Sequence, residues 1–235
     1  MELFSFSRLS LFRTCPKRWY YKYVLGQDDP AGPPAILGKT VHKANELCLK
    51  GCSLEDVVVT AYLEEGDSTV EKQTVESMVK TALSYQYSGS VEQHFIITLT
   101  KGIKLQGYID LVPNNVQIPT IVDWKTGFKR YKVLDTWQLP LYAAAVMEQT
   151  GVDVVKGVLA FLRFNTTRTA LIGQKEVALA KTWAINTAEE IQQRLELLAI
   201  LQPNEAFPAK PSPACGNCPW CVQCLRTELG IRLIA

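Results

Sequence analysis

Apolar residues in the first ninety positions of the chain follow the spacing of amphipathic helices, which bury one face. The first helix is expected to begin with Ser7 as its cap and to end before residues 28–34, which are rich in Asp, Pro and Gly. The helices that this pattern predicts cover residues 7–23, 36–50, 54–64 and 74–87. The N-terminal third is therefore predicted to be mainly helical.

From about residue 93 the period of the pattern changes to one that is typical of β-strands. Strands are predicted at residues 95–100, 104–112, 120–125, 155–164 and 170–177, and helices at residues 135–149 and 183–201. A proline-rich run then leads to a group of cysteines near the end of the chain. Strands in this order inside a helical wrapping predict an α/β fold with a mixed sheet.

Length and composition narrow the class of protein. A chain of 235 residues, 47% of them hydrophobic and 20% charged, is long enough for one domain with a substantial core. No apolar run approaches the roughly 18 residues that span a bilayer. Glu2 stands where a secretory signal would carry basic residues. We therefore expect a cytoplasmic protein with no membrane contact.

A hairpin between the second and third strands brings two carboxylates together. Pro113 and Pro119 flank its turn, and a turn centred between them places Asp110 opposite Asp123. Directly opposed residues of an antiparallel pair have Cβ atoms roughly 5 Å apart. Lys125 follows Asp123 by two residues, so it projects from the same face of the sheet.

This arrangement is typical of metal-assisted chemistry, because two facing carboxylates repel each other unless a cation lies between them. Carboxylate oxygens favour Mg²⁺ or Mn²⁺, and the backbone carbonyl of Trp124 can add a further oxygen ligand. Such an ion polarises a phosphodiester and lowers the pKa of bound water. The ammonium of Lys125 can orient that water or offset charge on the phosphate. An isolated Asp-x-Lys is usually a surface ion pair, so the prediction rests on the combination of motifs.

Net charge is only +2, so the distribution of basic residues carries more information than their number. Arg18 lies among aromatic residues of the first helix, and Lys129 and Arg130 follow the central Asp-x-Lys. Basic residues beside aromatic ones can hold phosphates and stack bases. The alternative is an ordinary solvated helix face over a normal core.

Taken together, these motifs resemble the RecB-like branch of the PD-(D/E)xK nuclease superfamily. The strings that carry the resemblance are Gly38-Lys39-Thr40-Val41-His42, Gly107-Tyr108-Ile109-Asp110, Asp123-Trp124-Lys125 and Gln138-Leu139-Pro140-Leu141-Tyr142. The resemblance implies that Asp110, Asp123 and Lys125 are catalytic, and that His42 joins the two aspartates and the Trp124 carbonyl as a metal ligand. It also implies that Gln138 and Tyr142 touch DNA or support the site, whereas composition alone would make them the polar edge of an amphipathic helix. Glu46, one turn after His42, is left unassigned.

The fold implied by this resemblance is a restriction-endonuclease-like core, with a central mixed β-sheet flanked by helices. We expect a single nuclease domain over residues 1–235, made of a mainly helical part (1–90), the nuclease core (91–202) and a cysteine-rich segment (203–235).

Cys215, Cys218, Cys221 and Cys224 are separated by two residues each, which is typical of a metal site. One interpretation uses all four, in a zinc site or a ferredoxin-like run. The other takes Cys215, Cys218 and Cys224 together with Cys15 and leaves Cys221 spare. This second set resembles the iron–sulfur-containing RecB-like nucleases, in which a [4Fe–4S] cluster joins the two ends of the domain. We favour the second set, with Zn²⁺ at the C-terminal cysteines as the alternative.

The sequence thus predicts a metal-dependent DNA exonuclease that acts on single strands or frayed ends. The chain has no Gly-x-x-x-x-Gly-Lys-Ser/Thr phosphate loop, so the nuclease either works alone, which we favour, or takes its motor from a partner helicase. Similar nucleases serve in phage or bacterial recombination, or in CRISPR adaptation together with an integrase. The alternatives are a DNA-binding or assembly module with an inactive site, and a redox-sensing cluster protein.

Overall fold

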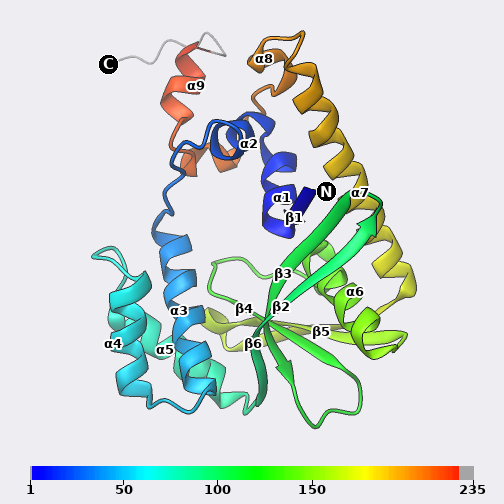
Figure 1. Ribbon diagram of the computed structural model, residues 1–235. Helices are drawn as coiled ribbons and strands as arrows, with labels where there is room; N and C mark the ends of the chain where they lie inside the picture. Colours follow the sequence, from blue (N-terminus) through cyan, green and yellow to red (C-terminus); the bar gives the residue numbers. More distant parts are fainter. Residues whose placement is uncertain (1, 228–235) are drawn as a thin grey trace. The chain divides into compact units, whose positions relative to one another are not determined.

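Two units make up the structure, a computed structural model that describes residues 2–227. One unit, here called the sheet unit, comprises residues 31–97 and 106–181. The other, here called the cysteine unit, comprises residues 1–30, 98–105 and those from 182 onward. Figure 1 shows the helices and strands of both.

A mixed sheet forms the centre of the sheet unit. Its strands are β2 (Gly89–Thr100), β3 (Ile103–Pro113), β4 (Thr120–Lys125), β5 (Val154–Phe161) and β6 (Thr166–Gly173). They follow the order β3-β4-β5-β6, and β2 pairs with β3. The β4–β5 pair is parallel, whereas β3–β4 and β5–β6 are antiparallel. The α/β fold with a mixed sheet flanked by helices is therefore confirmed.

The register of the β3–β4 pair is the one predicted from the turn prolines. Leu111 lies opposite Val122, which places Asp110 opposite Asp123. Strand β4 is buried along almost its whole length, because helices cover both of its faces. Its apolar residues hold the strand in place, so the position of Asp123 is fixed by the core.

Helices α3 (Pro33–Leu49), α4 (Leu54–Glu65) and α5 (Lys72–Ser84) lie on one side of the strands, and α6 (Gln138–Thr150) lies on the other (Figure 1). The first three share one apolar core with the sheet, to which β4 contributes Val122 and Trp124. On the other side, Phe95 and Tyr142 pack edge to face with ring centroids 5.3 Å apart. Gly107 allows this contact, since a Cβ there would come within 2.8 Å of Phe95 and 3.0 Å of Tyr142. The glycine of the Gly-x-x-Asp motif thus lets α6 approach the sheet.

An aromatic core holds the cysteine unit together. The unit contains β1 (Glu2–Ser5), α1 (Phe6–Thr14), α2 (Pro16–Tyr23), α8 (Pro203–Ala206), the 3₁₀ turn η3 (Pro213–Asn217) and α9 (Cys221–Thr227). It also contains the tip of the β2–β3 hairpin, where Glu2 N–H donates to the carbonyl of Gly102 at 2.9 Å. Trp19 and Phe207 stack with ring centroids 5.7 Å apart, and Phe12 meets both rings edge on.

The prediction of one continuous helix over residues 7–23 is wrong, because the chain forms two helices, α1 and α2, with a break at Cys15. Cys15 has extended backbone angles (φ −158°, ψ 107°), as expected of a residue that precedes proline. Ser5 rather than Ser7 caps α1, and its hydroxyl accepts from Arg8 N–H at 3.2 Å.

The last long helix also differs from its prediction. Helix α7 (Gln174–Leu197) begins nine residues early, and β6 stops at Gly173. Gly173 N–H donates to the carboxylate of Glu176 at 3.0 Å, a capping contact that starts the helix at this point. The end of the predicted strand 155–164 is likewise a 3₁₀ turn, η2 (Leu162–Phe164). In the part of the chain that the structure describes, no helix combines the length and apolarity needed to cross a membrane.

Candidate active site

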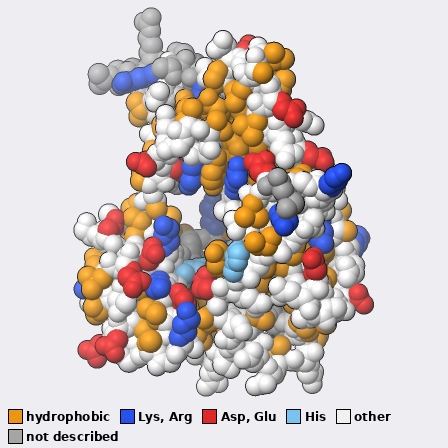
Figure 2. Space-filling model, in the orientation of Figure 1, with side chains coloured by type: hydrophobic (Ala, Val, Ile, Leu, Met, Phe, Trp, Pro, Cys, Tyr) orange, Lys and Arg blue, Asp and Glu red, His pale blue; other side chains and the backbone are white. Residues whose placement is uncertain are grey.

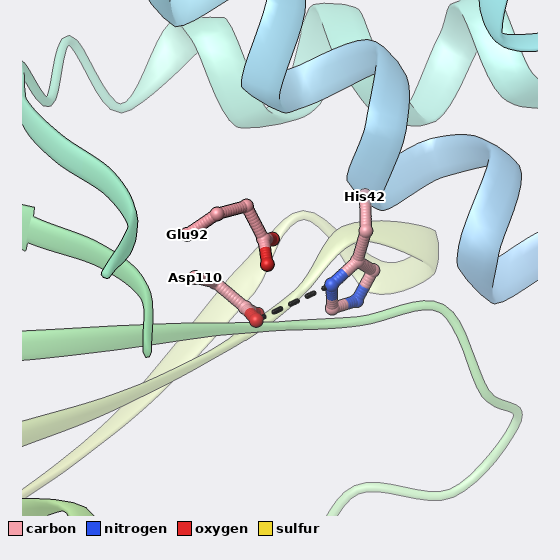
Figure 3. Close-up of side chains that lie close together, drawn as sticks. All are labelled: His42, Glu92 and Asp110. Atoms are coloured by element: carbon pink, nitrogen blue, oxygen red, sulfur yellow. Dashed lines mark ion pairs between the residues drawn. The ribbon is translucent and has the colours of Figure 1, made fainter. Parts of the chain in front are cut away.

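His42 connects helix α3 to the two strands that carry the aspartates. Its Nδ1 lies 3.3 Å from Asp110 Oδ1 (Figure 3). Its Nε2 lies 2.9 Å from the carbonyl oxygen of Trp124. Asp110 Oδ2 in turn accepts a hydrogen bond from Trp124 N–H at 2.7 Å. The imidazole, a carboxylate and a backbone carbonyl from three different elements therefore meet at one point.

Charge dominates the protonation of His42. Burial disfavours the imidazolium, but the carboxylates of Asp110 and Asp123 outweigh it and raise the pKa of His42 to about 9. The protonated ring supplies a positive charge beside these carboxylates. A metal ion would displace that proton, because a ligating imidazole must be neutral.

Glu92 is a third acidic group at this point, and the sequence analysis did not assign it. Ligand atoms of His42, Glu92 and Asp110 all lie within 4.8 Å of one another, and Figure 3 shows the three side chains turned toward a common centre. Glu92 comes from β2 with a φ of +47°, a left-handed conformation that is uncommon for a residue other than glycine. Burial and the charge of Asp110 raise the pKa of Glu92 to about 7. The residue lies before the predicted start of its strand, and its sequence position gave no signal of this role.

A second group of contacts holds Lys125. Its Nζ lies 2.5 Å from Asp123 Oδ2 and donates to Gln138 Oε1 at 2.9 Å. Gln138 Nε2 then donates to the hydroxyl oxygen of Tyr142 at 3.3 Å. Gln138 and Tyr142 therefore hold the lysine from α6. Tyr131 approaches the same ammonium from the segment after β4.

Asp123 and Lys125 form a buried ion pair. Burial raises the pKa of Asp123, and the positive charge of Lys125 offsets part of that rise. Burial by itself would lower the pKa of Lys125, but the negative charge of Asp123 outweighs it, so the pKa of the lysine is raised and the ammonium stays charged. Burial also raises the pKa of Tyr142 to about 12, which keeps its hydroxyl neutral.

The donor set suits a hard divalent cation. Asp123 Oδ2 is buried, and the ammonium of Lys125 lies 2.5 Å from it. The carboxylates of Asp110 and Glu92, the Trp124 carbonyl and the His42 imidazole lie on the same side of the sheet edge. Sites rich in oxygen with a single imidazole fit Mg²⁺ or Mn²⁺ better than softer metals.

An open pocket of about 390 Å³ leads to this group of ligands. Its lining includes His42, Glu46, Glu92 and Asp110. Glu46 is already engaged, since its carboxylate lies 2.5 Å from Lys50 Nζ and 3.6 Å from Lys43 Nζ. On the face of the molecule drawn in Figure 2, histidine side chains are exposed among acidic and basic ones.

The residues predicted to guide DNA lie in two places. Lys129 and Arg130 are exposed in the segment after β4, where the guanidinium of Arg130 lies 5.1 Å from the ring centroid of Phe164. Arg18 belongs to the cysteine unit, in which it donates to both carboxylate oxygens of Asp29 at 2.7 and 3.3 Å.

Five cysteines of the cysteine unit line one pocket. They are Cys15, Cys215, Cys218, Cys221 and Cys224. Arg18 lines the same pocket, and burial raises the pKa of the Cys218 thiol against the opposing effect of the Arg18 charge. Clustered thiols beside a guanidinium fit a metal ion or an iron–sulfur cluster, either of which binds cysteine as thiolate. Cys15 lies at the break before Pro16 and lines the pocket with its distant partners.

Of the comparisons with known proteins, the match to a family model agrees with this chemistry. The family model of the PD-(D/E)XK nuclease superfamily matches residues 3–225. The solved structure titled "Crystal structure of SSO0001" aligns with a TM-score of 0.43 and 14% identity, over 94% of this chain and 85% of that one. No curated protein matches the chain.

Proposed function

Because the chain belongs to the PD-(D/E)XK nuclease superfamily, we propose that it is a metal-dependent DNA exonuclease acting on single strands or frayed ends. One observation carries the proposal of a metal-dependent nuclease. Asp110 and Asp123 oppose each other across β3 and β4, with His42 on one side of them and the ammonium of Lys125 on the other. A protein that only binds DNA gains nothing from opposed carboxylates, which repel phosphate.

We assign the metal ligands to His42, Asp110 and Glu92, whose ligand atoms lie together, and to the Trp124 carbonyl, which contacts His42. Asp123 is kept in this set because it lies opposite Asp110 across β3 and β4. Mg²⁺ or Mn²⁺ at this position would supply a Lewis acid and a water of lowered pKa. Asp110 is oriented for this role by the N–H of Trp124, and Asp123 by burial in β4. Because these side chains are already held in position, they need not move when the phosphate of the substrate binds.

Lys125 keeps its proton and presents a fixed positive charge. Gln138 Oε1 accepts a hydrogen bond from the ammonium, and Gln138 Nε2 donates one to the hydroxyl of Tyr142. In this arrangement the ammonium orients the attacking water or stabilises the negative charge that develops on the phosphate. Gln138 and Tyr142 act through Lys125, so we assign them to positioning.

In the cysteine unit we propose a [4Fe–4S] cluster held by Cys15, Cys215, Cys218 and Cys224. The pocket that these thiols share with Arg18 supports the assignment. A cluster at this point would join α1 and α2 to the C-terminal segment and stabilise the unit, as a long-range disulfide does. Zn²⁺ bound by the four C-terminal cysteines is the competing assignment. A helicase or a CRISPR integrase remains the class of partner that we propose.

Digestion of linear and circular forms of one single-stranded DNA tests the exonuclease proposal. An exonuclease degrades the linear form and leaves the circle intact, because it needs an end. A duplex with frayed ends should be cut faster than a blunt duplex of the same sequence. Cleavage of the circle at a similar rate would contradict the proposal and indicate an endonuclease, which the same family and site would still accommodate.

A further inference from the structure

An exposed aromatic side chain lies three residues beyond the lysine of the proposed site. Phe128 is 72% exposed, although burial of a phenylalanine ring is worth about 1.5–3 kcal/mol to a fold. The guanidinium carbon of Arg163 lies 3.9 Å from the centroid of the Phe128 ring. One face of the ring is therefore covered by a cation, and the side chain as a whole remains open to solvent.

A second pair of the same kind lies beside the first. Arg130 stands over the ring of Phe164 at 5.1 Å. Phe128 and Arg130 come from the segment after β4, whereas Arg163 and Phe164 come from η2, directly after β5. Each segment thus gives one arginine and one phenylalanine to the other, and we term these four side chains the Phe–Arg ladder.

Strand pairing puts the ladder at the edge of the sheet where Lys125 lies. Strands β4 and β5 are parallel, and Lys125 lies beside Phe161 at their carboxyl ends. Both ladder segments leave the sheet from these two residues. Ligands of α/β proteins commonly bind at the carboxyl ends of parallel strands, where the connecting loops converge.

The segment after β4 is anchored at both ends, so its tip has a defined position. Arg163 Nε donates to the carbonyl of Thr126 at 3.3 Å. Tyr131 packs edge to face on Phe161 with centroids 5.5 Å apart, and Val133 is buried. Between these anchors, residues 127–130 are exposed. Such a segment presents Phe128 without a large entropic cost on binding.

A shallow groove gives a flat ring space to lie on Phe128. Phe128 and Arg163 line it together with Pro33, Pro34 and Leu37 of α3, and its volume is about 240 Å³. The rest of its wall is formed by Thr69, Val70, Glu71 and Thr74. The basic residues next to the ring are Lys129, Arg130 and Lys132. Apolar contact area with adjacent positive charge fits a nucleobase attached to phosphates better than it fits an apolar peptide.

We propose that Phe128, backed by Arg163, is a stacking platform for an unpaired nucleobase of the DNA strand that enters the active site. The proposal rests on the proposed function and extends it, because it gives a physical reason for preferring single strands or frayed ends. Bases of an intact duplex are already stacked on one another, so only an unpaired base can use the platform. The guanidinium of Arg130 and the ammonium of Lys129 would hold the neighbouring phosphates.

The platform can be tested by binding alone, with the full chain purified anaerobically and kept without added divalent metal. The probe is a short single strand that carries 2-aminopurine near one end, whose fluorescence falls when the base stacks on an aromatic ring. Phe128→Ala should weaken binding roughly 5- to 150-fold, the range that corresponds to ~1–3 kcal/mol per stacked base, and abolish the quenching. Phe128→Trp should keep both, and affinity for a blunt duplex should change little in either variant.

Leu63→Ala is the matched control, because Leu63 is another highly exposed apolar residue of the sheet unit, at 77%, and lies on α4. It should bind the single strand as the parent does. Unchanged affinity and quenching in Phe128→Ala would overturn the proposal. The exposed Phe128 ring would then have to serve a different kind of partner. Metal-dependent cleavage is scored separately. If the parent protein cuts DNA but Phe128→Ala binds normally, only the platform proposal is contradicted. If the parent protein cuts no DNA with any metal, the proposed nuclease function is contradicted.

Discussion

Asp110 lies opposite Asp123 across the β3–β4 pair, and its Oδ2 accepts a hydrogen bond from the N–H of Trp124 at 2.7 Å. One oxygen of Asp110 is thereby fixed to the backbone, and the other faces His42 at 3.3 Å. This relationship joins the two aspartates, the carbonyl of Trp124 and the imidazole in one rigid arrangement. The predictions that follow depend on it.

Replacement of Asp110 should remove metal binding while leaving the fold in place. Asp110→Asn keeps an oxygen that can accept from Trp124 N–H but loses the negative charge. Loss of a residue next to a ligand costs about 10- to 100-fold in metal affinity, so loss of a direct ligand should cost at least this much. Calorimetric titration with Mn²⁺ measures the change. Asp153→Asn, at an exposed position, is the control, and equal affinity in the two variants would remove Asp110 from the ligand set.

Replacement of Lys125 should separate catalysis from metal binding. Lys125→Met keeps much of the side-chain volume and removes the charge, so the cleavage rate should fall by roughly 10²- to 10³-fold. Mn²⁺ affinity should not fall, because a positive charge near the ligands is lost. Single-turnover cleavage and Mn²⁺ titration of the same sample give the two values. A variant that cuts normally would show that Lys125 serves only the ion pair with Asp123.

Metal affinity should increase with pH, because bound protons compete with the metal. Without metal, the pKa of His42 is raised to about 9 and that of Glu92 to about 7. Between pH 7 and 9 one proton must leave, so affinity should rise about tenfold per pH unit, and below pH 7 the rise should be steeper. Above pH 9 it should level off. Titrations with Mn²⁺ at several pH values measure the slope, and a flat profile from pH 6 to 9 would exclude both residues as ligands.

Two substitutions of Glu92 should differ in stability and have the same effect on metal binding. Both Glu92→Gln and Glu92→Gly remove the charge and should weaken Mn²⁺ binding. Only Glu92→Gly relieves the left-handed backbone at φ +47°, which should raise the free energy of unfolding by about 1 kcal/mol relative to Glu92→Gln. Chemical denaturation without metal compares the two. Strong Mn²⁺ binding by either variant would show that Glu92 only borders the site.

Removal of single cysteines should identify the cluster ligands. Cys15→Ala should lose the visible absorption of an iron–sulfur cluster and melt at a lower temperature, because Cys15 joins α1 and α2 to the C-terminal segment. Cys221→Ala should keep both the absorption and the melting temperature. The reverse outcome, with Cys15 dispensable and Cys221 required, would favour a site made by the four C-terminal cysteines. Metal analysis of the same samples distinguishes iron from zinc.

Local signals in the sequence were sufficient to predict much of the sheet. Pro113 and Pro119 fix the turn between β3 and β4, so the opposition of Asp110 and Asp123 follows from their positions alone. The break at Cys15 also had a local signal, the proline that follows, but the run of aromatic and basic residues around it resembled one continuous helix.

Features that depend on distant pairing were not predictable in the same way. Glu92 reaches the site through a left-handed residue inside β2, and its neighbours in sequence do not indicate that conformation. The contact between Phe128 and Arg163 depends on the parallel pairing of β4 with β5, strands that are separated by a whole helix. Sequence periodicity shows that a strand exists, but it does not show which strand lies beside it.

Cleavage of end-labelled DNA by anaerobically purified protein, with Mn²⁺, Mg²⁺ or EDTA, tests the central claim most directly. We expect single-stranded and frayed substrates to shorten from an end in Mn²⁺ or Mg²⁺ and to stay intact in EDTA, and Asp110→Asn to cut nothing under any of these conditions. Protein that is folded and loaded with its cluster but leaves every substrate intact would contradict the claim. Digestion that Asp110→Asn carries out as fast as the parent would contradict it equally.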